Sequence, residues 1–307
     1  MYFSQFGSII KDKSGGVCAV SLNKNMKKAQ KMQTFIDFFS EHSIQSYGVL
    51  PFSACTVTRP YLYEKNGLPS PKSVIPFLIP YYTGMGENLS AYAVSRDYHA
   101  YAKALFADLA RFTADAYPDA TFLGFADHSP IDERDAAARA GLGVIGKNGL
   151  LIHKDYSSFV FIAEILSSLP PEALGIESKI HEIAYCCGCG ACRAACPTGV
   201  LCGKSDKCLS AITQKKGALD AEEIRLIREN GTAWGCDACQ TVCPYTTAAI
   251  ACGSILTPIE FFRKERVTRL SRDGLCAMSD EEFAVRAFSW RGKDVICRNL
   301  AILEEKE

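Results

Sequence analysis

Apolar runs within the first 165 residues predict a set of strands. The run SVIPFLIPYYT at 73–83 is rich in Ile, Phe and Tyr, as expected of a buried strand, and TFLGFA at 121–126 predicts a second. The stretches NGLLIHK at 148–154 and SFVFIAEIL at 158–166 predict two more. Each run is shorter than the roughly 20 apolar residues that a membrane-spanning helix requires, so we expect no membrane span.

Two other segments have the pattern of helices. Apolar residues recur every three or four positions within 97–116, which predicts an amphipathic helix. The residues expected on its buried face are Ala102, Leu105, Leu109 and Phe112. The alanine-rich stretch ERDAAARA at 133–140 favours a second helix. Strands that alternate with helices indicate a layered domain of α/β or α+β type.

The chain divides where its composition changes. A proline-containing linker, SLPPEALGIESKI at 168–180, follows the last predicted strand. We therefore predict an α+β protein with three parts: an α/β domain at 1–167, a cysteine-rich module at 180–250 and a short helical segment at 251–307.

Charge and the N-terminal sequence restrict the class of protein. Lys and Arg number 34, Asp and Glu also 34, so the formal net charge is zero. Contact with a nucleic acid would then depend on local basic patches rather than on overall charge. The opening sequence MYFSQFGSIIKDK lacks the features of a signal peptide, and we expect a cytoplasmic, monomeric protein.

Cysteine is the residue type whose distribution is most informative. The chain has 15 cysteines; none lies within 56–185, and most lie within 186–243. Clustered cysteines in a chain of this length indicate metal binding or redox chemistry rather than disulfides. We expect Cys187 and Cys202 to be spare thiols. Five others are expected to be buried small residues, namely Cys18, Cys55, Cys252, Cys276 and Cys297.

Two cysteine motifs, each ending in Cys-Pro, form an imperfect internal repeat. The first, C-x2-C-x2-C-x3-C-P, comprises Cys186, Cys189, Cys192 and Cys196. The second, C-x2-C-x3-C-P, follows a lone Cys208 and comprises Cys236, Cys239 and Cys243.

The spacing of these motifs predicts iron–sulfur clusters. In two-cluster ferredoxins the cysteine before the proline binds the other cluster. One [4Fe–4S] cluster is then expected on Cys186, Cys189, Cys192 and Cys243. A second is expected on Cys208, Cys236, Cys239 and Cys196. A zinc ribbon, which also uses C-x2-C pairs, is the alternative.

Clusters whose irons are all bound by cysteine carry electrons and do no group chemistry of their own. About 165 residues precede them, more than an electron carrier needs. We therefore favour an enzyme with a second redox centre in the N-terminal domain. An electron-transfer protein is the alternative.

The stretch ARAGLGVIGKN at 138–148 contains the dinucleotide-binding pattern G-x-G-x-x-G, and Glu164 follows at the spacing of a ribose-binding acid. That fingerprint requires a strand, then the glycine loop, then a helix. Here a helical pattern precedes the glycines and a strand pattern follows them. We therefore predict a helix end, with Gly141 near the C′ position, and no dinucleotide site.

A series of motifs, in this order, resembles the epoxyqueuosine reductase family. They are RDYH at 96–99, DHSPIDERDAAARAGLGVIGKNGLLI at 127–152, SSFVFIAEI, the paired cluster motifs with DKCLSAITQKKG and WGCDACQTVCP, and SWRGKDVICRN at 289–299. The similarity runs from about residue 68 to 302. It implies a reductase that converts epoxyqueuosine to queuosine at the wobble position of tRNA. It also implies cobalamin, held between a nitroreductase-like α/β domain and a ferredoxin-like module.

The resemblance implies that Asp127 supplies a proton while reduced cobalt acts on the epoxide-bearing ring. Asp127 opens the pattern D-x-x-x-x-x-[DE]-R, which Glu133 and Arg134 complete. Opening an epoxide leaves an alkoxide, so an acid must lie nearby. We expect burial beside the cofactor to raise the pKa of Asp127. A role as N-cap of the following helix is the alternative.

Other positions are assigned by the same resemblance. The residues expected to face cobalamin, besides Asp127, are Ser90, Leu151, Ile152, His153, Ser210, Asp237 and Ala238. Lys216 matches a tRNA-contacting lysine, and His99 is expected to form structural hydrogen bonds. The implied partners are tRNA and an external electron donor such as ferredoxin or flavodoxin. A related corrinoid iron–sulfur reductase that acts on a small molecule, such as an organohalide, is the alternative.

Overall fold

The centre of the N-terminal part is a four-stranded antiparallel sheet in the computed structural model, which describes residues 35–201 and 206–305. The strand order is β1-β2-β6-β3, so strands distant in sequence lie side by side. The strands are β1 (Leu50–Pro51), β2 (Ser73–Pro80), β6 (Val160–Ser167) and β3 (Phe122–Ala126). The strands predicted at 73–83, 121–126 and 158–166 are confirmed.

Strand β2 is buried over its whole length because both of its faces are covered. Ile75, Phe77 and Ile79 belong to the main hydrophobic core on one face. Val74 and Leu78 belong to smaller clusters on the other face. A strand covered on both sides reads as a continuous apolar run, which is why the sequence predicted it without alternation.

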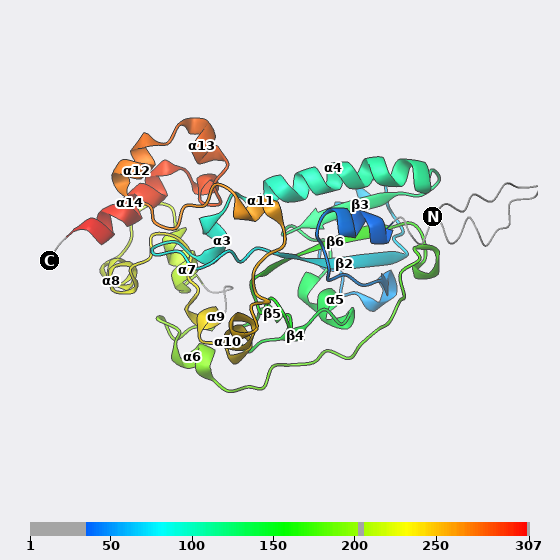
Figure 1. Ribbon diagram of the computed structural model, residues 1–307, viewed down its shortest axis with the longest axis horizontal. Coiled ribbons are helices and arrows are strands. Elements are labelled where there is room, and N and C mark those ends of the chain that lie inside the picture. The colour runs from blue at the N-terminus through cyan, green and yellow to red at the C-terminus, as the bar shows by residue number, and fades with distance from the viewer. Residues whose placement is uncertain (1–34, 202–205, 306–307) are drawn as a thin grey trace, which may run out of the picture.

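The two predicted helices cover opposite faces of this sheet, as Figure 1 shows. Helix α4 (Tyr98–Ala116) packs Leu105 and Leu109 into the main core. Helix α5 (Glu133–Arg139) packs its alanines against the other face. The ends of β2, β3 and β6 that lie next to the cysteine module carry the loops of the candidate site.

Short elements complete the N-terminal part. Strands β4 (Val144–Ile145) and β5 (Leu151–Ile152) pair as a separate hairpin. Residues 35–41 are helical. The other short elements are η1 (Phe52–Ala54), α2 (Tyr61–Glu64), α3 (Ala91–Val94) and η2 (Pro171–Ala173).

The cysteine module and the C-terminal segment are helical. The module contains α6 (Ala191–Ala194), α7 (Leu209–Thr213), α8 (Ala221–Asn230), α9 (Ala238–Thr241) and α10 (Pro244–Ala251). The C-terminal segment contains α11 (Glu260–Arg263), α12 (Arg272–Ala277), α13 (Asp280–Ala284), η3 (Ser289–Arg291) and α14 (Lys293–Glu304). The prediction that 251–307 is helical is confirmed for these described elements. Over residues 35–201 and 206–305, no helix has both the length and the apolar character to cross a membrane.

The C-terminal segment packs against both other parts. Ile259 and Phe262 lie in the main core beside the sheet. Phe288 packs edge-on against Trp234 of the module, and Ile302 packs with Ile227 of α8. The three-part division at 167, 180 and 250 stays a prediction, and residues 1–34 of its first part lie outside the described residues.

The glycine-rich stretch is a helix end, as predicted. Gly141 follows the last residues of α5 with φ of 78°. Its N–H donates to the carbonyl of Ala138, and the N–H of Leu142 donates to that of Ala137. These two bonds form a Schellman motif, which satisfies the carbonyls left free at the helix end. The next glycine, Gly143, lies against the strand β5.

Gly143→Ala tests this packing. A Cβ at position 143 would lie 2.5 Å from the carbonyl oxygen of Ile152, which is backbone and cannot rotate away. We expect a loss of about 1–3 kcal/mol in the free energy of unfolding, measured by urea titration. Gly274→Ala in α12 is the matched control, because its Cβ would meet only the movable Ser271 hydroxyl. Equal stability of the two variants would contradict the packing described.

Candidate functional site

The described cysteines of the two motifs gather in two neighbouring groups. Cys243 lies within electrostatic range of Cys189 and Cys186. Cys236 lies within range of Cys208 and Cys196. These neighbours follow the crossover that the spacing predicts, in which each Cys-Pro cysteine lies with the other motif. Cys239 interacts with both Cys208 and Cys192, so the groups adjoin one another.

A cavity lies at the centre of the first group. Four of its lining residues are Cys186, Cys189, Cys192 and Cys243. Gly188 and Gly190 also line it, both with positive φ, which allows the loop to wrap around the cavity. Four thiols around one space are the donor set that a [4Fe–4S] cluster needs. In the described residues, no three His, Cys, Asp or Glu side chains are grouped to hold a single metal ion.

Burial favours the protonated form of two of these thiols. It raises the pKa of Cys236 to about 11 and that of Cys239 to about 12. The side chain of Asn148 acts in the opposite direction on Cys239. Binding of iron therefore requires release of these protons.

The glycine-rich loop positions the first cluster motif. The N–H of Ile145 donates to the carbonyl of Ala184 at 2.9 Å, and the N–H of Cys186 donates to the carbonyl of Ile145 at 3.1 Å. Two residues after Ile145, the N–H of Lys147 donates to Sγ of Cys186 at 3.3 Å. Hydrogen bonds to cluster sulfurs influence the reduction potential. Lys147 and Asn148 were not predicted from the sequence, because this pairing joins segments about 40 residues apart.

A hollow lined by acids lies at the end of the sheet next to this loop. Its lining includes Asp127 and Glu133, the stacked rings of Tyr98 and Phe161, and Leu151. Arg134, which completes the predicted pattern, donates to the carbonyl of Gly149 at 2.8 Å and so connects α5 to the loop. The N-cap of α5 is Asp132, not Asp127, so the alternative role considered for Asp127 is wrong.

The prediction that burial raises the pKa of Asp127 is wrong in this structure. The side chain is 70% exposed, and the pKa is lowered, chiefly by His99. Nε2 of His99 lies 3.7 Å from Oδ2 of Asp127, and Nδ1 lies 2.8 Å from Oδ1 of Asp97. The two carboxylates, Asp127 first, raise the pKa of His99 to about 9. His99 forms the expected hydrogen bond, and it also holds a proton beside Asp127.

Two acids behind Asp127, the partly buried Glu133 and the buried Glu164, have raised pKa values. Burial raises the pKa of Glu133 to about 7, and the charge of Asp127 adds to this. One of its oxygens has no hydrogen-bond partner among the described residues. Burial also raises the pKa of Glu164 well above its usual value. Glu164 therefore lies inside the sheet as a neutral group, which agrees with the absence of a ribose-binding role.

Three of the residues predicted to face cobalamin line a second hollow on the cluster side. Ser90, Asp237 and Ala238 line it together with Cys236. Oδ2 of Asp237 accepts a 2.6 Å hydrogen bond from the N–H of Ala91. Burial raises the pKa of Asp237 to about 6.

A short chain of hydrogen bonds connects the two hollows. Asp237 accepts a hydrogen bond from the side chain of Gln240, which in turn accepts one from Ser158 of the acid-lined hollow.

The other predicted positions lie elsewhere. Ile152 lines the cysteine cavity rather than either hollow. His153 is buried, with Nε2 3.1 Å from Ser46 Oγ and Nδ1 accepting from the N–H groups of residues 155 and 156. Ser210 hydrogen-bonds to Gln214 within the module, and Lys216 is exposed. His153 and Ser210, which were predicted to face cobalamin, therefore do not line either hollow, and the tRNA contact of Lys216 stays a prediction.

The remaining cysteines differ in part from expectation. Cys252 and Cys276 are exposed, so the prediction that they are buried is wrong. Cys55 and Cys297 are partly buried, and Cys187 is exposed, as a spare thiol would be. Cys18 and Cys202 lie outside the described residues.

Comparison with known proteins defines the class of this site. A family model described as a 4Fe-4S double cluster binding domain matches residues 185–246. The chain is thus an iron–sulfur protein of the double-cluster class, joined to an α+β domain.

Curated relatives identify the family. The epoxyqueuosine reductase of Gloeobacter violaceus is 34% identical over 226 residues, which cover 70% of this chain and 69% of the relative. That of Synechocystis is 32% identical over 245 residues, covering 75% and 78%. This chain belongs to the epoxyqueuosine reductase family, and is therefore an oxidoreductase. It spans only 54% of the relative from Listeria monocytogenes and 50% of that from Escherichia coli.

Solved structures confirm the predicted fold class. The epoxyqueuosine reductase of Streptococcus thermophilus has a TM-score of 0.70 at 24% identity, covering 90% of this chain and 80% of that one. An epoxyqueuosine reductase solved with an epoxyqueuosine-modified tRNA-Tyr stem loop has a TM-score of 0.71, covering 90% and 81%.

Paired substitutions test the two cysteine groups. Cys186→Ser with Cys243→Ser removes two ligands from the same predicted cluster, so we expect about half of the iron and sulfide to remain. Cys186→Ser with Cys236→Ser removes one ligand from each and is expected to lose most of both. Iron analysis and electron paramagnetic resonance of anaerobically reconstituted protein measure the difference. Cys252→Ser, an exposed thiol, is the control; equal losses in the two double variants would contradict the crossover.

Glu164→Gln tests the neutral buried acid. Because the folded state holds a proton on Glu164 that the unfolded state loses above about pH 4.5, its contribution to stability is complete below that pH and decreases as pH rises. The uncharged variant lacks this loss. The difference in the free energy of unfolding between the variant and the natural protein should be more favourable to the variant at pH 8 than at pH 5, by about 1 kcal/mol or more. Urea unfolding at the two pH values measures this difference. The exposed Glu281→Gln should show no such gain, and parallel pH profiles for E164Q would contradict the assignment.

Proposed function

We propose that this protein reduces the epoxide of epoxyqueuosine in tRNA to the alkene of queuosine. The observation that carries the proposal is the loop at 147–152. Its first residues, Lys147 and Asn148, line the cysteine cavity, and Leu150 and Leu151 line the acid-lined hollow. Because consecutive Cα atoms lie about 3.8 Å apart, the cluster site and the acids are within roughly 10 Å of each other along this loop.

The clusters are proposed on the two cysteine groups described above. When bound, they supply electrons one at a time to the neighbouring hollow. The protein's own contribution there is to position the thiolates, of which Cys236 and Cys239 are partly buried. Members of the family named as epoxyqueuosine reductases support this use of the electrons.

The chemistry also requires protons, because removal of the epoxide oxygen as water consumes an electron pair and two protons. Asp127 alone is a poor donor near neutral pH, since its pKa is lowered. His99 holds a proton beside it, and Glu133 in the same hollow has a pKa of about 7. We infer that Asp127 transfers to the substrate a proton drawn from His99, and that Glu133 is a second source.

Asp127 lies exposed in the loop that follows strand β3. Asp127 has φ of 67°, a left-handed conformation that is strained for most residues. A solved Bacillus subtilis epoxyqueuosine reductase has its catalytic aspartate loop swung out of the active site. By analogy, the exposed Asp127 of this chain corresponds to an open position, and substrate binding would bury it.

Cobalamin is the second cofactor proposed. The two hollows lie between the sheet and the cluster module, one with Asp127 and Leu151 and the other with Ser90, Asp237 and Ala238. The unpartnered oxygen of Glu133 gives this region a polar group free to meet a ligand. When bound, cobalamin would supply low-valent cobalt for reduction of the epoxide-bearing ring. The placement of His153 and Ser210 gives no support to their predicted contacts with it.

The tRNA substrate and the remaining partners follow from the family. A relative solved with an epoxyqueuosine-modified stem loop supports tRNA as the macromolecule. The exposed Lys216, beside the Lys215–Glu223 ion pair, is available for phosphate contact. We propose a ferredoxin or flavodoxin as electron donor, and a cytoplasmic monomer as the working form.

Asp127→Asn tests the proposal. Asn tolerates the left-handed conformation, so the fold is kept while the acid is lost. With reconstituted clusters, cobalamin and a chemical reductant, we expect conversion of epoxyqueuosine in tRNA to slow by about 100-fold or more, measured by nucleoside mass spectrometry. His99→Gln should slow it as well and remove any decline in rate as pH rises through about 9.

Asp119→Asn, an exposed carboxyl remote from the hollow, is the matched control. Full activity of D127N would contradict its role as proton donor. No conversion by the natural protein, with turnover of an organohalide or a free epoxide instead, would replace the tRNA substrate with a small molecule.

A further inference from the structure

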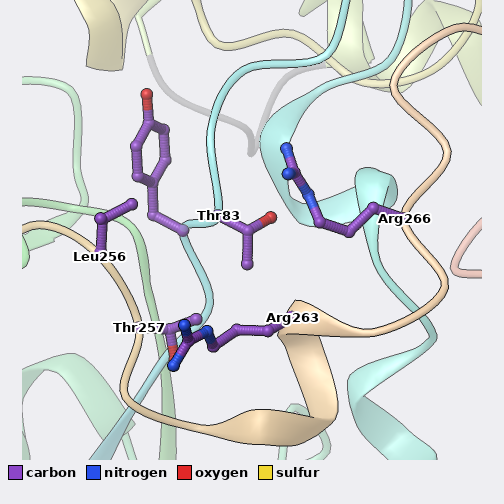
Figure 2. A pocket seen from close by; sticks show the side chains of 6 residues that line it. Thr83, Leu256, Thr257, Arg263 and Arg266 are labelled. Carbon is purple, nitrogen blue, oxygen red and sulfur yellow. The ribbon is translucent and has the colours of Figure 1, made fainter.

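A cavity of about 450 Å³ lies apart from the hollows described above. It is lined by Tyr82, Thr83, Leu256, Thr257, Arg263 and Arg266. Figure 2 shows Arg263 and Arg266 reaching into it from the segment that contains α11, with Thr83, Leu256 and Thr257 on the other side. Two cationic side chains and three hydroxyl-bearing side chains line this space, and none of its lining residues in the described part of the chain is acidic.

The two arginines of this cavity differ from the neighbouring basic residues in that they form no ion pairs. Lys264 pairs with Glu260, Arg269 with Glu87 and Arg272 with Glu304, and these are the basic residues of the same segment outside the cavity. Arg263 and Arg266 form no ion pair or hydrogen bond with the residues that the structure describes. On a basic face that is merely solvated, we expect no relation between ion pairing and the cavity. Here the two basic residues of the segment that lack an ion pair are the two that line the cavity.

The backbone and one hydroxyl also indicate a ligand. Oγ1 of Thr83 is buried and has no partner among the described residues. Such a group costs free energy unless a ligand or water binds it. Gly84, with φ of 115°, has no side chain to obstruct Arg266. A Cβ at position 84 would lie 3.0 Å from Nη2 of Arg266. The hydroxyl of Thr257 already donates to the carbonyl of Pro80, so Thr83 is the hydroxyl free to donate.

We propose that this cavity binds a phosphodiester, with Arg263 and Arg266 as its cationic contacts and Thr83 as a hydroxyl donor. Guanidinium groups bind phosphate oxygens through paired, charge-assisted hydrogen bonds. Tyr82 lines the cavity, and the neighbouring Tyr81 lies against Phe161 of the acid-lined hollow with ring centroids 4.4 Å apart. A phosphodiester held here would belong to a ligand whose reacting part occupies the hollow.

This proposal rests on the proposed function for the source of the phosphodiester. Both the RNA backbone beside the modified nucleotide and the nucleotide portion of cobalamin contain one. The same chemistry serves either, and binding measurements distinguish them.

The test compares Arg263→Gln/Arg266→Gln with Lys264→Gln/Arg269→Gln, each in the full chain with reconstituted clusters. Both double variants lose two positive charges from one segment, but only the first loses the cavity contacts. Because Arg263 and Arg266 are exposed and without ion pairs, we expect the melting temperature to stay unchanged in the first variant. Four probes are titrated: inorganic phosphate, an anticodon stem-loop RNA, cobalamin, and cobinamide, which lacks the nucleotide.

If the RNA supplies the phosphodiester, the cavity variant binds the stem loop roughly 10- to 100-fold more weakly than the control variant. Its log–log salt dependence should also be shallower by about one to two. If cobalamin supplies it, the cavity variant loses affinity for cobalamin by a similar factor and shows no change for cobinamide. Equal affinities of both variants for the stem loop and for cobalamin would overturn the proposal.

Inorganic phosphate distinguishes failure of this site from failure of the proposed function. If inorganic phosphate raises the melting temperature of the natural protein and of the control variant but not that of the cavity variant, the anion site is supported, even if no epoxyqueuosine is converted. Conversion at the natural rate by the cavity variant, with unchanged binding of every probe, would retain the proposed function and reject the site.

Discussion

The structure depends on the backbone pairing between Ile145 and the residues next to Cys186. This pairing fixes the first cysteine motif against the end of the sheet, and through Lys147 it places an N–H on the sulfur of Cys186. The short distance between the cluster site and the acid-lined hollow follows from it, because one loop borders both. The glycines of ARAGLGVIGKN allow this approach: Gly141 ends α5, and Gly143 lies against β5 with no room for a side chain. The glycine pattern that resembles a nucleotide site thus forms the contact between the α/β part of the chain and the cysteine module.

The parts of the fold that were predictable from the sequence are those that local chemistry determines. Strand β2 is apolar throughout because both faces are covered, and α4 shows its buried stripe because only one is. The cysteine groups follow from spacing, since a cluster needs four sulfurs around one centre. The order β1-β2-β6-β3 was not predictable in this way, because it depends on pairing between strands up to about 100 residues apart.

The sequence was sufficient to find residues of the candidate site but not to predict their protonation states. Asp127 and Glu133 were both found through one motif, but the pKa of Asp127, which was expected to be raised, is lowered, and that of Glu133 is raised. Asp127 is exposed beside His99, whereas Glu133 is buried beside a carboxylate. Burial and neighbours decide a pKa, and neither is visible in a motif. In the same way His153 follows the glycine loop directly, yet its ring faces Ser46 inside the domain.

Charged side chains that lack a partner indicate the candidate functional residues in this molecule, whereas paired ones do not. Most charged groups near the site are paired, as Lys264, Arg269 and Arg272 are, and such surface pairs contribute little to stability. Among the described residues, one oxygen of Glu133 in the acid-lined hollow has no hydrogen-bond partner, and Arg263 and Arg266 in the other space form no ion pair. An unpaired acid with a raised pKa suits proton transfer, and unpaired guanidinium groups suit an anionic ligand. Tyr82 lines the second space and Tyr81 packs against Phe161 of the first, and on the proposal above a single ligand would place its neutral ring at the acids and its phosphate at the arginines.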